Sequence, residues 1–491
     1  MLLTVGISLY STRLVLNALG NSDYGIYNLI AGVIAMLSFL SNTMATSTQR
    51  FLSYYQGKDD FFSQRKIFTT SIFLHLIVAF AILLFLLLTG AFLFDGFLNI
   101  PFERIQAAKG LFYFMIASVF FTIITVPFNA TLIAHENMLF VAVVNIIEVL
   151  LRVIAAISLY YITIDRLVGY GAFILAITIV SFIMYVAFCL KNYRECRISK
   201  RLLDRKMLNQ LSSLASWNLF GSLASMGRLQ GTAILFNLFI GTIINAAYGI
   251  ANQVSSQMSF FSSTLIRALD PQIMKSEGAE NRQRMIRLSL MACKFGFFLM
   301  AIIAIPCIVE MERILEFWLG TVPNNTVAFC RLILLSALIN QLSIGLQSAI
   351  QAIGNVKMYQ LIVSAILICN LPVAYFLLRF KYNPNLVLGS YCIIELIASG
   401  WKFLYLNKTT SLTFKAYAKT VLAKIVLPSL TAVCIALYCK TYVQMDNLRF
   451  IITVLCSSVS SLVVIYLAGL EVEEKKKVNN LILNVLKFVK R

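Results

Sequence analysis

Long apolar runs separated by short polar loops dominate the chain of 491 residues. Fourteen runs approach or exceed the ~20 residues that a membrane-spanning helix needs. They cover roughly residues 1–19, 24–50, 67–95, 108–133, 138–162, 168–190, 210–238, 242–268, 287–309, 327–352, 358–379, 385–406, 420–439 and 448–469. A backbone in lipid must satisfy its own hydrogen bonds, so such runs form helices. The pattern predicts an all-α, polytopic transmembrane helical bundle of about fourteen spans.

Composition supports a membrane protein, since 59% of residues are hydrophobic and only 13% are charged. Soluble proteins carry roughly twice that share of charge. The net charge of +20 would suit nucleic acid, but the basic residues cluster in loops, as the positive-inside rule expects. The ten cysteines lie mostly within apolar runs and form no C-x-x-C, which is typical of core residues rather than zinc or disulfide sites. The first run is not framed as a removable signal peptide.

The distribution of Lys and Arg predicts both termini on the cytoplasmic side, and with them an even number of spans. The most basic loop separates two six-helix lobes. The predicted division is an N-terminal lobe at 1–190, a basic cytoplasmic linker at 191–209, a C-terminal lobe at 210–406, spans 13 and 14 at 407–470, and a tail at 471–491. Apolar residues at helical period in 478–491 predict an amphipathic helix on the membrane surface. The alternative for this segment is a solvated basic tail.

One sequence order occurs twice. Arg13–Asn28 reads RLVLNALGNSDYGIYN, and Arg228 is followed by Asn237, Gly241 and Tyr-Gly-Ile-Ala-Asn at 248–252. The common order is Arg, Asn, Gly, then Tyr-Gly-Ile-x-Asn. It predicts a duplicated half, arranged as a parallel repeat, although the unequal spacings leave chance as the alternative. The break at Gly20–Asp23 predicts a tight helical hairpin.

Charges inside spans are costly and mark candidate functional sites. Arg13 and Asn17 share a helix face and would offer a guanidinium and an amide to an anionic, oxygen-rich ligand. The alternative is an arginine that snorkels to the membrane interface. Arg228, with Gln230 close behind it, lies deep in the seventh run.

Four further charges are weaker candidates. Arg50 and Arg267 lie near the inner ends of the second helix of each half, where ordinary positive-inside flanking is an equal alternative. Glu148 and Glu395 are candidate coupling-ion sites, although Glu148 and Arg152 are four apart and favour an ion pair within the helix. Because acidic residues in spans are few, we expect a net positive cavity that attracts anions and repels cationic drugs.

Sequence motifs typical of nucleotide-binding proteins and metalloproteases are absent. The sequence contains no Walker A motif, no Gly-rich nucleotide loop and no H-E-x-x-H, and no loop exceeds about twenty residues. We therefore expect a protein that is not an enzyme and has no cofactor or metal. The two histidines, His75 and His135, are expected to be an interior polar group and a loop residue.

The chain resembles a known family at several places in order. These are the stretch Arg13–Asn28, T-Q-R-F-L-S from Thr48, A-H-E-N around His135, S-W-N-L-F-G-S-L around Trp217 and N-A-A-Y-G-I-A-N-Q-V around Tyr248. They resemble bacterial polysaccharide-biosynthesis membrane proteins. These are the O-antigen and capsular repeat-unit flippases of the multidrug/oligosaccharidyl-lipid/polysaccharide exporter superfamily.

The resemblance implies two six-helix lobes around a central cavity, alternating access, and an undecaprenyl-pyrophosphate-linked oligosaccharide as substrate. It implies a cationic cavity, to which Arg13, Arg50, Arg228 and Arg267 would correspond. The bacterial inner membrane is the implied location, and membrane lipids and glycan assembly enzymes are the implied partners. Spans 13 and 14 resemble the pair that forms a lipid-tail groove in the related lipid II flippase.

Two other functions remain alternatives. A multidrug or metabolite antiporter of the same fold predicts unpaired acidic residues in the cavity, in which this sequence is poor. A membrane polysaccharide polymerase or ligase is expected to carry a large outer loop with catalytic residues, and the outer loops here are short.

Overall fold

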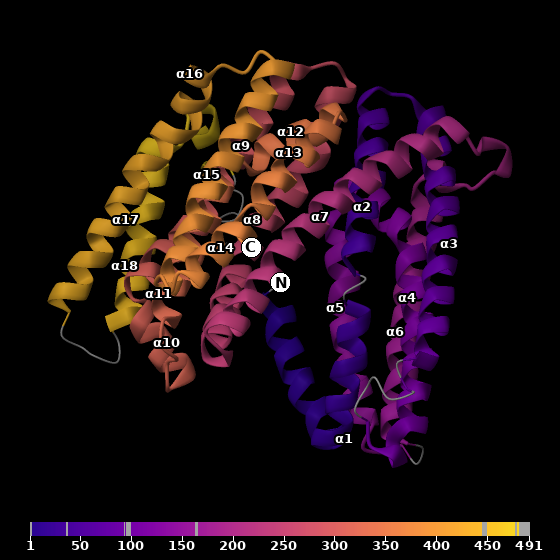
Figure 1. The fold of residues 1–491 in the computed structure, drawn as a ribbon. Coiled ribbons are helices and arrows are strands. Elements are labelled where there is room, and N and C mark those ends of the chain that lie inside the picture. The colour runs from indigo at the N-terminus through magenta and orange to yellow at the C-terminus, as the bar shows by residue number, and fades with distance from the viewer. Residues whose placement is uncertain are drawn as a thin grey trace, which may run out of the picture. The chain divides into compact units, whose positions relative to one another are not determined.

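The computed structural model describes residues 2–35, 38–92, 94, 100–162, 165–443, 449–476 and 479–480. All regular secondary structure in these ranges is helical, which confirms the predicted all-α class (Figure 1). The chain divides into two compact units. Unit 1 comprises Met1–Leu219 with Gly278–Glu280, and unit 2 comprises Phe220–Glu277 with Asn281–Arg491.

Unit 1 is organised around α4. Its helices are α1 (Leu2–Ala35), α2 (Ser38–Gly57), α3 (Phe61–Phe92), α4 (Ile105–Ala134), α5 (Met138–Ser158), α6 (Arg166–Asn192) and the first part of α7 (Arg205–Phe239), with short 3-10 turns η2 (Phe102–Arg104), η3 (Arg194–Cys196) and η4 (Lys200–Leu202). Helix α4 packs against α6, α3, α2 and α1. Leu111, Phe112 and Ile116 of α4 are buried in the shared core, so α4 holds the unit together.

Unit 2 is built on α9 and α15. It contains the rest of α7, α8 (Thr242–Gly278), α9 (Arg282–Val309), α10 (Met311–Leu319), α11 (Thr326–Gln341), α12 (Ile344–Ile353), α13 (Lys357–Ile368), α14 (Asn370–Arg379), α15 (Pro384–Thr409), α16 (Phe414–Tyr417), η5 (Ala418–Leu422), α17 (Ala423–Tyr442), α18 (Arg449–Val464) and η6 (Ile465–Gly469). Helix α9 packs against α11, α12, α17 and α18, whereas α15 packs against α11, α13 and α14.

Within the described residues, nine helical segments are long and apolar enough to cross a membrane, and the bent pair α11–α12 makes a tenth. These match the predicted runs three to six and nine to fourteen. The other four predicted runs fall in α1, α2, α7 and α8, which contain 34, 20, 35 and 37 residues. The chain is therefore a multi-pass membrane protein. One boundary differs from the prediction, because the run at 24–50 is shared between the second half of α1 and α2.

Each unit reverses direction at a glycine after its first span. Gly20 interrupts α1 with φ 78° and ψ 169°, and in Figure 1 the indigo ribbon turns back on itself near the label α1. Gly241 separates α7 from α8 with φ 118°. Both angles lie in the region that only glycine enters without strain. These are the glycines of the repeated order, so the predicted hairpin at Gly20 is confirmed and the predicted duplication gains support.

A tyrosine contact accompanies the turn in each unit. Tyr27 packs edge-on against Tyr170 of α6, with ring centroids 5.0 Å apart. In unit 2, the hydroxyl of Tyr248 lies 3.1 Å from that of Tyr391 in α15. In both units the helix that follows the turn is thus joined to the sixth predicted span of its lobe.

Arg104 clamps the turn of unit 1. Its Nη1 lies 2.6 Å from an Asp165 carboxylate oxygen and its Nε donates to Asp23 at 2.8 Å. Burial raises the pKa of Asp165, but hydrogen bonds from Arg104 and from the backbone N–H of Val168 outweigh it and hold that pKa below its usual value. The clamp joins the α1 turn to the starts of α4 and α6. The predicted amphipathic tail at 478–491 lies outside the described residues, apart from Asn479 and Asn480.

We predict that Gly241→Ala destabilises the protein, because a Cβ at positive φ costs about 1–2 kcal/mol. Thermal unfolding of the purified protein in detergent would measure the loss. Gly227→Ala is the matched control, because Gly227 lies inside α7 with no atom within 4 Å of an added Cβ. It should be neutral or slightly stabilising. Equal melting temperatures for the two variants would contradict the strained turn.

Candidate substrate cavity

Unit 2 contains a half-open cavity of about 410 Å³ between α7, α8, α11, α12 and α15. Most of its lining side chains end in a hydroxyl or an amide. The lining consists of Ser225, Arg228, Leu229, Asn252, Ser255, Ser259, Ser263, Ile333, Ser336, Ala337, Asn340, Gln341, Ile344, Tyr391 and Glu395. The cavity therefore presents many hydrogen-bonding groups beside apolar surface.

A stripe of small polar residues on α8 forms one wall. Asn252, Ser255, Ser259 and Ser263 follow one another at steps of three and four, which places them on one face of the helix. This period could have been read from the sequence, and sequence reasoning missed it. The stripe offers donors and acceptors along the cavity without adding charge.

The two charged lining residues, Arg228 and Glu395, pair with each other. Nη1 of Arg228 lies 3.2 Å from Oε2 of Glu395. The Glu395 side chain is 4% exposed and that of Arg228 is 19% exposed. Asn340 of α11 donates to the other oxygen of Glu395 at 2.5 Å. A buried carboxylate needs such partners, because the charge is expensive to bury alone.

The aromatic ring of Tyr391 packs against the guanidinium of Arg228. Arg228 lies over the Tyr391 ring with 4.9 Å between its Cζ and the ring centroid. The Tyr391 hydroxyl is 2.8 Å from that of Thr232 and also contacts Tyr248. A cation over an aromatic face is stabilised by about 0.5–2 kcal/mol. The network holds Arg228 between α15 and the start of α8.

A break between α11 and α12 brings two amide side chains to the cavity wall. Helices α11 and α12 are bent by 43° at Leu342 and Ser343. Asn340 and Gln341 immediately precede the break, and both line the cavity. Gln341 accepts a hydrogen bond from Ser262, and the absence of a side chain at Gly296 makes room for it, since an added Cβ would lie 3.1 Å from Oγ of Ser262. Broken helices of this kind occur at membrane depth where the backbone lines a cavity.

A second buried cation lies beyond the break. Lys402 is 3% exposed, and its Nζ donates to Ser343 at 3.3 Å. Ser343 in turn contacts Ser399 at 2.9 Å. Glu395, Ser399 and Lys402 share one face of α15 by their spacing. These three residues thus form a polar stripe along one face of α15.

Unit 1 has a separate buried polar cluster. Arg50 of α2 is buried, with its Cζ 4.6 Å from the Phe51 ring and 4.8 Å from the Tyr54 ring. Two residues before it, Thr48 contacts Ser71 at 2.8 Å, and Nδ1 of His75 lies 2.7 Å from the carbonyl oxygen of Ser71. Over the ranges that the structure covers, Nε2 of His75 finds no partner. Within those ranges, only one of the two ring nitrogens of His75 therefore has a hydrogen-bond partner.

Of the predicted site residues, the structure brings together Arg228 and Glu395. Gln230 and Arg267 are exposed and do not line the cavity, and Asn17 is exposed on α1. Arg13 lies in α1, but its side chain is outside the description. Glu148 is half-buried on α5, and in the described part of the chain it forms no ion pair with Arg152.

The charges that line the unit 2 cavity are balanced, and the net positive cavity expected between the two lobes stays a prediction. The only charged groups among the lining residues are one cation and one anion, and they neutralise each other. Sequence reasoning treated Glu395 as a charge without an identifiable partner, because its partners are 167 and 55 positions away. Lys294 is paired over a similar separation, since its Nζ lies 2.6 Å from a carboxylate oxygen of Glu474, 180 positions away.

We predict that Arg228 and Glu395 are energetically coupled. Arg228→Gln and Glu395→Gln should each lower the melting temperature. The double variant should lose less stability than the sum of the losses in the two single variants. The coupling should be about 1–3 kcal/mol, as for neighbouring buried groups. Arg313→Gln with Glu316→Gln is the control cycle. That exposed pair at 3.3 Å should give a coupling near zero. Additive losses at Arg228 and Glu395 would contradict the pairing.

Comparisons with known proteins agree with this architecture. Residues 1–158 match the family model MatE, and no curated protein matches the chain. The fold is similar to that of MATE in the bent conformation, with a TM-score of 0.72, 15% identity, and 83% of this chain and 93% of that chain covered. It is similar to an outward-facing multidrug resistance MATE family transporter of the MOP superfamily, with a TM-score of 0.70, 16% identity and coverage of 85% and 93%.

A third similar structure is a MOP superfamily transporter from Pyrococcus furiosus. Its TM-score is 0.70 at 15% identity, with 83% of this chain and 92% of that chain covered. For that protein, reversed polarity of the binding pocket is said to suggest a different function. At these identities the likenesses establish the fold. The chain thus has the fold of the MATE transporters of the MOP superfamily, and its first 158 residues match their family model.

Proposed function

We propose that the protein is an alternating-access flippase for undecaprenyl-pyrophosphate-linked oligosaccharide repeat units. The observation that carries the proposal is the cavity of unit 2, in which one guanidinium stands among hydroxyl and amide side chains. The MATE-type fold supports transport. The nature of the cargo is inferred from the chemistry of the lining.

The lining suits a saccharide. A sugar exposes several hydroxyls, each able to donate and accept hydrogen bonds. Serine hydroxyls and the amides of Asn252, Asn340 and Gln341 can do the same. Because these groups are neutral, they can exchange water for sugar at little net cost. A cavity for lipophilic drugs would be expected to be lined mainly by apolar and aromatic side chains.

Arg228 would receive the anionic head group. Its contact with Glu395 uses Nη1, and a guanidinium carries five N–H donors in a planar fork. A pyrophosphate oxygen can therefore be bound while Glu395 stays in place and orients the fork. Charge-assisted hydrogen bonds of this type contribute about 1.5–3 kcal/mol.

The membrane potential would assist export. With a negative interior, moving an anion outward gains about 2.3 kcal/mol per charge for each ~100 mV. We place the protein in the bacterial inner membrane with both termini cytoplasmic. Glycan assembly enzymes remain proposed partners. Further contributions to substrate binding by Arg13, Asn17, Arg50, Gln230 and Arg267, and to ion coupling by Glu148, remain predictions.

A multidrug antiporter is the second candidate, because a MATE structure of similar fold is that of a multidrug resistance transporter. In this reading Glu395 would bind the cationic drug after releasing Arg228. The two functions therefore predict opposite effects of Glu395→Gln. Neutralising Glu395 leaves Arg228 free for an anion but removes the acceptor for a cation.

We predict distinct transport phenotypes in proteoliposomes. Translocation of a fluorescent undecaprenyl-pyrophosphate oligosaccharide should fall about ten- to a hundredfold in Arg228→Ala, since one charge-assisted contact is lost. Arg228→Lys should recover part of it, because the charge remains without the two-pronged geometry. Glu395→Gln should retain translocation, because the amide oxygen of glutamine can still accept a hydrogen bond from Arg228 and orient it. Arg313→Gln, an exposed arginine of α10, is the control and should match the wild type.

Ethidium efflux measured on the same vesicles separates the candidates. If Glu395→Gln abolishes ethidium efflux while the wild type and the variants move no oligosaccharide, the protein is a drug antiporter and the flippase proposal is wrong. Intact oligosaccharide translocation in Arg228→Glu at equal protein content would also contradict it.

A further inference from the structure

A second cavity of unit 2 lies where three candidate membrane spans begin or end, and it shares no lining residue with the first cavity. Its volume is about 280 Å³. The lining comes from the first residues of the span that begins at Arg282, from the segment around the start of the span at Phe414, and from the residues just after the span that ends at Gly469. Three span ends therefore meet around it, at the depth where lipid head groups lie.

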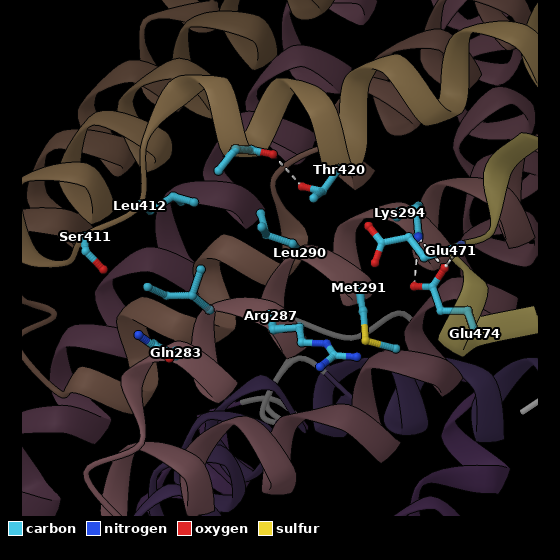
Figure 2. Close-up of a pocket in the computed structure, with 12 residues that line it drawn as sticks. Gln283, Arg287, Leu290, Met291, Lys294, Ser411, Leu412, Thr420, Glu471 and Glu474 are labelled. Atoms are coloured by element: carbon cyan, nitrogen blue, oxygen red, sulfur yellow. Dashed lines mark hydrogen bonds and ion pairs between the residues drawn. The ribbon is translucent and has the colours of Figure 1, made fainter. Parts of the chain in front are cut away.

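The cavity has an apolar and a charged part. Ile286, Leu290, Met291 and Leu412 supply apolar lining, whereas Arg287, Lys294, Glu471 and Glu474 supply the charges. Figure 2 shows these charged side chains around the same space, with Lys294 joined to Glu474. An apolar wall beside charged groups suits an amphiphile.

Lys294 and Glu474 form a buried ion pair. Nζ of Lys294 lies 2.8 and 2.6 Å from the two oxygens of Glu474, and the side chains are 3% and 7% exposed. Glu474 also accepts a hydrogen bond at 2.7 Å from the backbone N–H of Glu471. The pair is thus satisfied within the protein, and it fixes the segment after η6 against α9.

The other two charged lining residues, Arg287 and Glu471, can take a new binding partner at little cost. Arg287 contacts Glu473, but their side chains are 57% and 68% exposed, and a pair this exposed contributes little. Glu471 takes part in no ion pair within the described part of the chain. Among the described residues, the cavity therefore presents an exchangeable guanidinium and a carboxylate without an ion-pair partner.

We propose that this cavity binds the head group of an aminophospholipid. The phosphate would replace Glu473 on Arg287, and the primary ammonium would donate to Glu471. The volume suits a head group rather than a whole lipid. The acyl chains would leave along the exposed apolar side chains nearby, such as Phe414, Leu467 and Val472, which are 62%, 63% and 73% exposed.

Charge complementarity distinguishes this ligand from other phospholipids. An anionic phosphatidylglycerol offers a phosphate for Arg287 but nothing for Glu471, which would repel it. A phosphatidylcholine has a quaternary ammonium that cannot donate a hydrogen bond. Only a primary ammonium next to a phosphate satisfies both side chains.

Native mass spectrometry of the purified full-length protein tests the proposal, with phosphatidylethanolamine, phosphatidylcholine and phosphatidylglycerol of identical acyl chains. We expect phosphatidylethanolamine to bind about tenfold more tightly than the other two, as one charge-assisted contact allows. Glu471→Gln should remove this preference while leaving phosphatidylglycerol binding equal or stronger. Arg287→Gln should weaken all three.

Two variants serve as controls. Glu473→Gln removes the competing partner of Arg287 and should leave binding equal or tighter. Arg284→Gln changes an exposed arginine on the same helix that does not line the cavity, and should change nothing. Tighter binding of phosphatidylglycerol than of phosphatidylethanolamine, or a preference unchanged by Glu471→Gln, would overturn the proposal.

Discussion

The ion pair between Arg228 and Glu395 is the interaction on which the interior of unit 2 depends. A carboxylate that is 4% exposed inside a membrane bundle is tolerable only with a cation and a hydrogen-bond donor beside it. Arg228 from α7 and Asn340 from α11 meet both needs and join three helices at one point. Removing one partner from a buried pair typically costs about 3–5 kcal/mol, because the other charge is left alone. The pair thereby places a guanidinium in a cavity otherwise lined by neutral groups.

The surrounding backbone makes room for this pair. Gly241 lets α8 return alongside α7, so that Tyr248 reaches Tyr391. The break between α11 and α12 brings Asn340 and Gln341 to the cavity wall. Polar side chains at helical spacing along α15 and α8 complete the lining. A MATE-type bundle thus carries a cavity lined by neutral polar groups and one balanced ion pair, which supports the proposal of a polar cargo.

The sequence allowed prediction of what depends on local pattern. Apolar runs predicted the spans, and the break at Gly20 predicted a reversal. The repeated order aligned Gly241 with Gly20, and both glycines have positive φ. The depth of Arg228 and Glu395 singled them out individually. Their pairing could not be predicted, because a separation of 167 positions is closed only by tertiary packing. Asn340 was missed for the same reason. The serine stripe of α8 is different, since its period is present in the sequence and was overlooked.

Imaging the full-length protein bound to its cargo tests the central claim most directly. An electron cryomicroscopy map in lipid nanodiscs, with undecaprenyl-pyrophosphate oligosaccharide added, should show phosphate density within hydrogen-bond distance of Arg228. The saccharide should lie along Asn252, Ser255 and Ser259. Density for the pyrophosphate away from the unit 2 cavity, with the contact between Arg228 and Glu395 undisturbed and no ligand beside it, would contradict the account.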